Sequence, residues 1–114
     1  MPERGEVWVA NLNPRRGTEV GKTRPVLIVQ AQTLLDALHP STLICPLTTN
    51  LIDDAAPLRV RVAASGRLHH ASDLLIDQLR AIDNRRLIEG PLLRLDEPMM
   101  ARVATALREV LDLG

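Results

Sequence analysis

Two short, continuous apolar runs constrain the fold of this chain more than any other feature. They are "PVLIVQ" at residues 25–30 and "STLICPLT" at residues 41–48. Each has the length of a strand rather than of a helix, and neither alternates as a half-exposed strand does. We therefore expect both to be strands that are buried on their two faces. Pro46 predicts a bulge or a sheet edge near the end of the second run.

Three more segments have strand patterns. Residues 6–12 and 72–83 are rich in apolar and β-branched residues, and the second segment is long enough for one strand or for two. In "LRVRV" at residues 58–62 the apolar and charged residues alternate. This alternation places Arg59 and Arg61 on an exposed face.

A helix is expected at the end of the chain. Asp96 is a suitable N-cap, and Pro98 fits the first turn. The apolar residues recur at helical spacing, at Met100, Val103, Ala104, Leu107 and Leu111. Several strands followed by a helix, in a chain of 114 residues, predict one α+β domain that covers residues 1–114 and contains a small curved sheet or barrel.

The remaining segments predict connections. Residues 13–23 are a long loop, marked by Asn-Pro and two glycines, and residues 49–57 are another loop. Residues 31–39 form either a short helix or a connecting loop. The first of these loops leads directly into Arg24 and the first buried strand.

The composition argues against several classes of protein. Basic and acidic residues number 14 each, so no net charge draws the chain to nucleic acid or to a membrane, although a local basic patch is not excluded. Trp8 is the only aromatic residue, which argues against a platform for base stacking; we favour a core position for Trp8 and leave a stacking role open. Cys45 is a lone cysteine, and no signal region or membrane-spanning run is present, so we expect a cytoplasmic protein.

The histidines do not form a metal-binding pattern. His69 and His70 are adjacent, and neighbouring residues of a strand point to opposite faces. They are better interpreted, with His39, as solvent or turn residues. We expect no metal and no cofactor, and no serine lies in the setting of a hydrolase nucleophile.

Arg24 and Thr48 are the strongest candidates for a functional site. The proline that follows Arg24 favours an extended backbone there, so the buried strand can present the guanidinium at a fixed place. Thr48 ends the second buried strand. If the two strands pair in antiparallel fashion, the start of one meets the end of the other, and the two side chains lie side by side. A guanidinium next to a hydroxyl is a plausible phosphate site.

The order of motifs along the chain resembles a known family. The stretch "RGEVWVANLNPRRGTEVGKTRPVLIVQ" is similar to the N-terminal signature of the MazF/PemK (Kid) toxins, the endoribonucleases of toxin–antitoxin pairs. The similarity continues through "CPLTTN" and "DQLRAIDNRRL" to the terminal "LREVLDLG". It covers essentially the whole chain, and its combined motifs are specific.

The resemblance implies a fold and an activity. The fold is a small Src-homology-3-like barrel with short helices and a C-terminal helix, shared by the MazF, Kid and CcdB toxins. The activity is metal-independent, sequence-specific cleavage of single-stranded RNA, in which the 2′-hydroxyl attacks and leaves a 2′,3′-cyclic phosphate and a 5′-hydroxyl. The implied partners are a second copy of the chain and a MazE-like antitoxin. A CcdB-like toxin directed at gyrase and a catalytically inactive regulator are the alternatives.

The resemblance also implies roles for particular residues. Arg24 and Thr48 match the catalytic arginine and threonine of the family. Glu19 matches an acidic loop position proposed to assist in some members, and Asp77 matches an acidic position that acts as base in the Kid branch. The Kid branch uses an arginine two residues before this second acid, where this chain has Leu75. The positions expected to contact RNA are Arg15, Arg16, Thr18, Lys22, Thr49, Asn50, Gln78 and Arg80.

Overall fold

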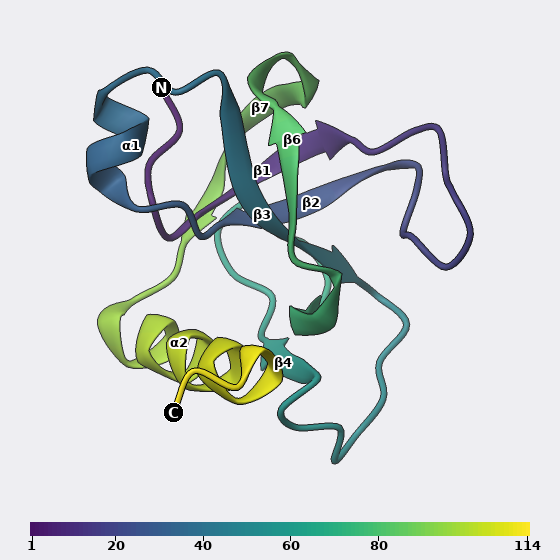
Figure 1. The fold of residues 1–114 in the computed structure, drawn as a ribbon. Helices are drawn as coiled ribbons and strands as arrows, with labels where there is room; N and C mark the ends of the chain where they lie inside the picture. The colour runs from purple at the N-terminus through teal and green to yellow at the C-terminus, as the bar shows by residue number, and fades with distance from the viewer.

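The computed structural model describes all residues, 1–114, as a curved antiparallel sheet with helices at its sides (Figure 1). The strands are β1 (Glu6–Asn11), β2 (Thr23–Ile28), β3 (Ser41–Thr48), β4 (Arg59–Val62), β5 (Ser72–Leu75), β6 (Arg80–Asp83) and β7 (Leu87–Arg94). The helices are α1 (Gln32–Asp36) and α2 (Glu97–Leu111), with 3-10 turns η1 (Ile76–Gln78) and η2 (Asn84–Arg86). The expected α+β class is confirmed, and the segment 72–83 contains two strands.

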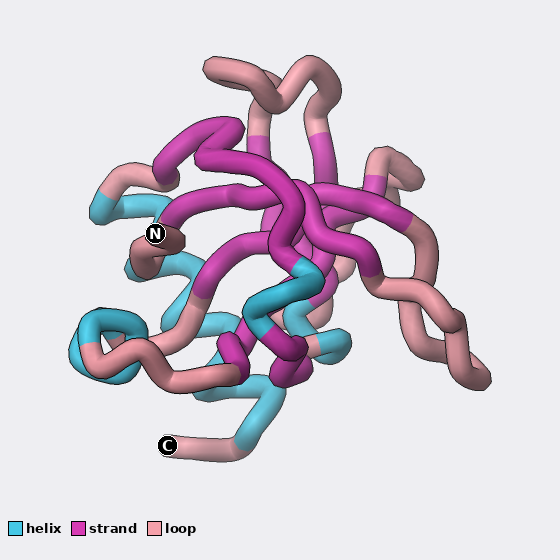
Figure 2. The backbone as a smooth tube through the Cα atoms, turned by 90° about the horizontal axis from the view of Figure 1, so that it is seen from above, coloured by secondary structure: helices cyan, strands magenta, loops and turns pink.

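Strand β3 is the centre of the sheet, whose order is β4-β5-β3-β2-β1-β7 with β6 also on β3. Along one edge β3 pairs with β2, with Val26 opposite Pro46. Along the other edge it pairs first with β6, over Ser41–Ile44, and then with β5 at Leu47 and Thr48. Pro46 therefore lies where the partner on that second edge changes. Seen from above, the strands cross one another in the middle of the molecule (Figure 2).

The two faces of β2 bury side chains in two different clusters. Leu27 joins a cluster that also contains Val103 of α2, whereas Val26 and Ile28 join a cluster with Ile44. All three β2 residues are fully buried. The prediction of a strand buried on both faces is confirmed, although β2 begins at Thr23, so that Arg24 belongs to the strand and not to the loop before it.

Helix α2 begins as the sequence predicts. The Asp96 side chain accepts a hydrogen bond from the Met99 backbone nitrogen at 2.9 Å, and Pro98 lies in the first turn. Val103 is buried and Met100 and Leu107 pack against the core, as expected. Two positions differ: Ala106 is buried rather than Ala104, and Leu111 is 47% exposed. Neither α1 nor α2 combines the length and the hydropathy that a membrane-spanning helix requires.

Strand β7 is absent from the sequence-based expectations because Gly90 and Pro91 interrupt its pattern. The strand nevertheless pairs with β1, with a register shift on either side of Val9. The indole of Trp8 packs directly against the backbone of Gly90. A Cβ atom at residue 90 would lie 2.5 Å from Cδ2 of Trp8, so a side chain does not fit there. The indole is partly buried against the Val26 cluster, which agrees with the core interpretation of Trp8.

We predict that Gly90→Ala destabilises the fold by about 1–3 kcal/mol, because the added methyl group overpacks the indole of Trp8. Trp8 is the only aromatic residue, so it alone gives the fluorescence of the protein. Its emission should shift in the folded variant, because the added methyl group changes the packing around the indole. Chemical denaturation followed by fluorescence measures both effects. Glu89→Ala, at an exposed neighbouring position of β7, is the control. Equal free energies of unfolding for Gly90→Ala and this control would contradict the packing argument.

Candidate functional site

Arg24 and Thr48 lie side by side, at the adjacent ends of β2 and β3. The paired register ends with Val26 opposite Pro46; continued by two residues it reaches Arg24 and Thr48, and both residues line the same two hollows of the surface. The guanidinium is also held in place: its Nε donates to the Gly21 carbonyl at 2.9 Å, and its Nη1 donates to the Leu47 carbonyl at 3.4 Å. The antiparallel pairing thus creates the side-by-side arrangement that the sequence predicts conditionally.

No carboxylate pairs with Arg24, in contrast to the six arginines that form ion pairs: Arg59, Arg61, Arg67, Arg80, Arg85 and Arg94. Partial burial lowers the pKa of Arg24 from its ordinary value. An arginine nevertheless stays protonated in proteins, so the side chain brings an unneutralised positive charge to the surface. Its remaining N–H groups are available to an external anion such as a phosphate.

Two hollows adjoin the pair, and both are lined by Lys22, Arg24 and Thr48. The first, which we call the loop hollow, has a volume of about 450 Å³ and is completed by Asn13, Arg15, Thr18, Glu19, Val20, Gly21, Arg59 and Leu75. The second, which we call the histidine hollow, has a volume of about 550 Å³ and is completed by Thr23, Pro25, Leu47, Thr49, Asn50, Arg67, Leu68, His69, His70, Ser72 and Leu92. Arg24 and Thr48 are therefore the divide between two open spaces.

Most of the residues that the sequence singles out gather at these hollows. Arg15, Thr18 and Glu19 belong to the loop hollow, whereas Thr49 and Asn50 belong to the histidine hollow. The loop that carries the first three projects away from the side of the sheet where α1 and α2 lie (Figure 1).

Four of the predicted positions line neither hollow. Arg16 is exposed, and Arg80 pairs with Glu19, with Nη1 and Oε2 3.5 Å apart. Asp77 and Gln78 belong to η1. Asp77 lies near the buried Cys45 instead: burial, and in second place the charge of Asp77, raise the pKa of the Cys45 thiol to about 12. Of the two acidic candidates, only Glu19 lines the hollow beside Arg24.

The structure adds two histidines that the sequence interpretation places in solvent or in a turn. His69 and His70 are exposed, yet they form part of the wall of the histidine hollow, which they share with Arg24. The position of this wall depends on how the 65–68 turn packs against β7. No local pattern contains that information.

A buried carboxylate is the other feature that sequence reasoning missed. Asp73 is 1% exposed and accepts hydrogen bonds from Arg61, from Arg59 at 3.1 Å and from the backbone nitrogen of Ile52 at 3.0 Å. Burial raises the pKa of Asp73, but these hydrogen bonds and the charge of Arg61 more than offset it, so the pKa lies below its ordinary value. Arg59 also donates to the Asn50 carbonyl at 2.7 Å. Asp73 therefore fixes the loop that carries Thr49 and Asn50.

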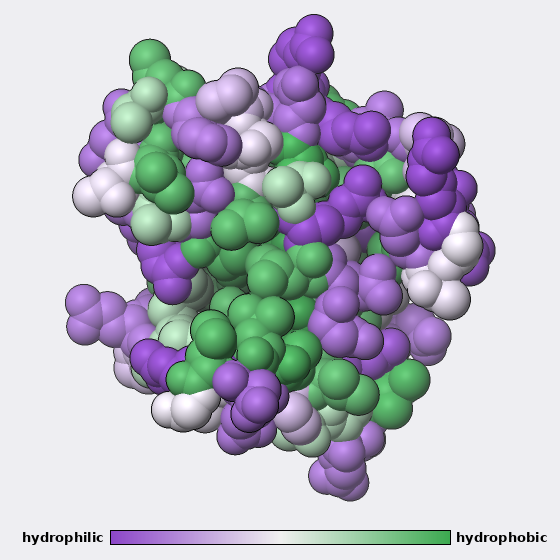
Figure 3. Space-filling view, in the orientation of Figure 1, coloured by the Kyte–Doolittle hydropathy of each residue, from purple (hydrophilic) through white to green (hydrophobic).

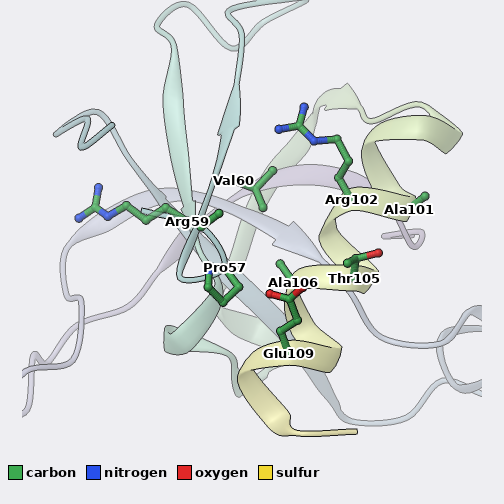
Figure 4. A pocket seen from close by; sticks show the side chains of 9 residues that line it. Pro57, Arg59, Val60, Ala101, Arg102, Thr105, Ala106 and Glu109 are labelled. Atoms are coloured by element: carbon green, nitrogen blue, oxygen red, sulfur yellow. The ribbon is translucent and has the colours of Figure 1, made fainter. Parts of the chain in front are cut away.

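The alternation expected for β4 is confirmed, because Val60 and Val62 are buried, but Arg59 and Arg61 on the other face are only partly exposed. Their side chains are 18% and 38% exposed, because both are drawn to the carboxylate of Asp73 on the paired strand. Figure 4 shows the cleft between β4 and α2, which is about 340 Å³ in volume, with the guanidinium of Arg59 directed away from the helix. Arg59 thereby links this cleft to the loop hollow.

We predict that Asp73→Asn lowers the free energy of unfolding at pH 7 by about 3 kcal/mol, because it leaves two guanidinium groups without their buried partner. A carboxyl with a lowered pKa stabilises the fold above its unfolded pKa, near about 4, and loses this effect as the pH falls through the folded value. The difference between variant and parent should therefore shrink below about pH 4.

Denaturant titrations at several pH values measure this effect. Asp53→Asn is the matched control, because the Asp53 side chain is 82% exposed and pairs only with Arg61. It should change stability by less than about 1 kcal/mol. Equal losses in the two variants would show that Asp73 has no special structural role.

Comparison with known proteins identifies the relatives of the chain. A family model described as a PemK-like, MazF-like toxin of type II toxin-antitoxin system matches residues 3–111. Endoribonuclease EndoA of Bacillus subtilis (strain 168) is 32% identical over 107 residues, which span 93% of this chain and 90% of EndoA.

Solved structures share the fold. MazF from Deinococcus radiodurans superposes with a TM-score of 0.80 at 23% identity, covering 97% of this chain and 96% of that one. A mycobacterial endoribonuclease in complex with its cognate antitoxin gives a TM-score of 0.77 at 22% identity, covering 100% and 98%. This chain belongs to the PemK-like, MazF-like toxins of type II toxin-antitoxin systems.

Proposed function

We propose that residues 1–114 form one toxin domain that cleaves single-stranded RNA next to Arg24 and Thr48. The single observation that carries this proposal is an anchored guanidinium, without a carboxylate partner, beside a hydroxyl between two open hollows. Relatives named as endoribonucleases support the choice of RNA as substrate.

The chemistry follows from these two groups. The 2′-hydroxyl of the substrate attacks the adjacent phosphorus and loses its proton to a base. The new bond closes a 2′,3′-cyclic phosphate, and the bond to the 5′-oxygen breaks, so that this oxygen leaves as a hydroxyl after it gains a proton. Arg24 stabilises the negative charge that develops on the phosphoryl oxygens. Thr48 binds a phosphate oxygen and orients the attacking group.

Glu19 is the better candidate for the base. Arginine cannot take this role because its pKa exceeds about 12. The carboxylate of Glu19 belongs to the same hollow as Arg24 and Thr48, and Arg80 holds it there, whereas Asp77 lines neither hollow. The RNA would then cross the divide between the hollows. We propose contacts to it from Arg15, Arg16, Thr18, Lys22, Thr49, Asn50, Gln78 and Arg80.

The proposal includes protein partners. An apolar area lies in the middle of the face that Figure 3 shows, between the regions of α1 and α2, and it suits a contact with a second copy of the chain. Structures of relatives with their antitoxins support a MazE-like antitoxin as the neutralising partner. We place the toxin in the cytoplasm, where RNA and antitoxin are both present. A gyrase-directed toxin and an inactive regulator are less favoured, because relatives of this chain are endoribonucleases by name.

We predict that the purified protein cleaves a long defined RNA in the presence of EDTA, because Arg24 and Thr48 supply charge stabilisation without a metal ion. The 5′ fragments should end in a 2′,3′-cyclic phosphate and the 3′ fragments should begin with a 5′-hydroxyl. Fragment mapping and mass spectrometry measure the sites and the ends. Activity that vanishes on chelation and returns with a divalent cation would overturn this mechanism, and no cleavage at all would favour the inactive regulator.

We predict that Arg24→Gln lowers the cleavage rate by about 10²–10³, as the loss of a preorganised charge donor does. Thr48→Val should also lose most of the activity, whereas Thr48→Ser, which keeps the hydroxyl, should retain it. The Thr48 hydroxyl accepts from the exposed Asn50 backbone nitrogen at 3.1 Å, so its loss should leave the fold intact. Single-turnover assays with circular dichroism separate rate from folding.

The control is Arg85→Gln. The side chain of Arg85, a residue of η2, is 91% exposed and pairs with Asp83 at the end of β6; neither residue lines a hollow. It should cleave like the parent. A folded Arg24→Gln variant with the parent's rate would remove Arg24 from the mechanism.

A further inference from the structure

The turn at residues 65–68 is firmly held against β7. Ser65 and Leu68 form an isolated bridge, and the Arg67 backbone nitrogen donates to the Leu92 carbonyl at 2.8 Å. Gly66 has a φ of +55°, and a Cβ atom there would lie 2.8 Å from the same carbonyl oxygen. Leu68 is 5% exposed and packs in the core. The residues that follow, His69 and His70, are therefore presented from a fixed support.

The wall that this turn forms is positive and has no acid. Five of the residues that line the histidine hollow carry or can gain a positive charge: Lys22, Arg24, Arg67, His69 and His70. None of its lining residues is Asp or Glu. Of these five residues only Arg67 has a carboxylate partner, Glu89, with Oε2 3.3 Å from Nη2 of Arg67, and both of these side chains are more than half exposed. A neutral molecule thus concentrates positive groups around one hollow.

The hollow has room for part of a nucleic acid strand. Its volume of about 550 Å³ lies within the range of small-molecule sites, so it can admit one nucleotide unit. The histidine side chains form no hydrogen bond inside the protein; only the His70 backbone carbonyl accepts one, from Ser72 at 3.0 Å. Their ring nitrogens are available to a ligand.

We propose that Arg67, His69 and His70 form a second phosphate-binding subsite, which binds the RNA phosphate that neighbours the one held by Arg24 and Thr48. This inference rests on the proposed function, because it takes the divide between the hollows as the place of cleavage. The subsite acts in binding and not in bond cleavage. It shares the hollow with Lys22, which precedes β2, and with Arg24 of β2.

The subsite makes RNA binding depend on pH. An imidazole is the ordinary side chain that gains a proton as the pH falls from about 8 to 5. The charged groups around the two imidazoles are Lys22, Arg24 and Arg67, which line the hollow, and the exposed Glu89, which pairs with Arg67. A bound phosphate favours protonation of the imidazoles strongly, so proton uptake accompanies binding. RNA affinity therefore rises as the pH falls.

The test uses a fluorescent 2′-O-methyl oligonucleotide, which lacks the attacking hydroxyl, with the sequence of a cleavage site mapped for this protein in EDTA. The parent should bind it several-fold more tightly at pH 6 than at pH 8. The double variant His69→Asn/His70→Asn should lose this gain. At pH 6 its plot of log Kd against log salt concentration should be less steep by about 1, since fewer phosphates are neutralised. Its KM for RNA should rise while kcat stays unchanged.

The matched control is His39→Asn. His39 is also exposed, but its Nδ1 lies 2.9 Å from the Ser41 carbonyl, and it contributes to neither hollow. This variant should keep the parent's pH dependence. A double variant that binds with the parent's affinity and pH dependence would overturn the subsite and leave the proposed function standing. A folded parent that cleaves no RNA would overturn both.

Discussion

The antiparallel pairing of β2 with β3 is the constraint on which the rest of the structure depends. Side chains of a strand alternate between faces, so a slip of one residue would exchange the two faces of β2. Leu27 would then leave the cluster that contains Val103, and Val26 would leave the cluster that contains Ile44. The same slip would move Arg24 away from Thr48. The packing of the core and the placing of the site are therefore one requirement.

The arginines near the site have two different roles. Arg59 and Arg61 share the buried carboxylate of Asp73, and their hydrogen bonds stabilise β4, β5 and the 49–57 loop. Arg24 is anchored only by backbone carbonyl groups, which orient it without neutralising it. Hydrogen bonds to carbonyl oxygens hold a guanidinium in place while its charge remains available to a phosphate. A chain with no net charge can therefore present a positive site.

Much of the fold could be predicted from local patterns, and the parts that could not depend on long-range contacts. The apolar runs of β2 and β3 predict their burial, and Asp96 predicts the start of α2. Strand β7 could not be predicted because Gly90 and Pro91 are unfavourable in strands. The reason why residue 90 must be a glycine is the close packing of Trp8, which only the folded structure shows. Asp73 stayed hidden because its partner Arg61 lies directly opposite on β4, a register that the sequence does not state.

The candidate site also has a part that local sequence patterns predict and a part that they do not. Arg24 and Thr48 lie at the ends of two apolar strands, so the pattern of those strands predicts where the two residues lie. The walls are built by the 13–23 loop, by the loop tied to Asp73 and by the turn that carries His69, and their positions come from contacts with distant segments. Substitutions in these walls leave the β2–β3 register intact. In the proposed site, the groups assigned to cleavage and the walls assigned to RNA binding are therefore positioned by different parts of the fold.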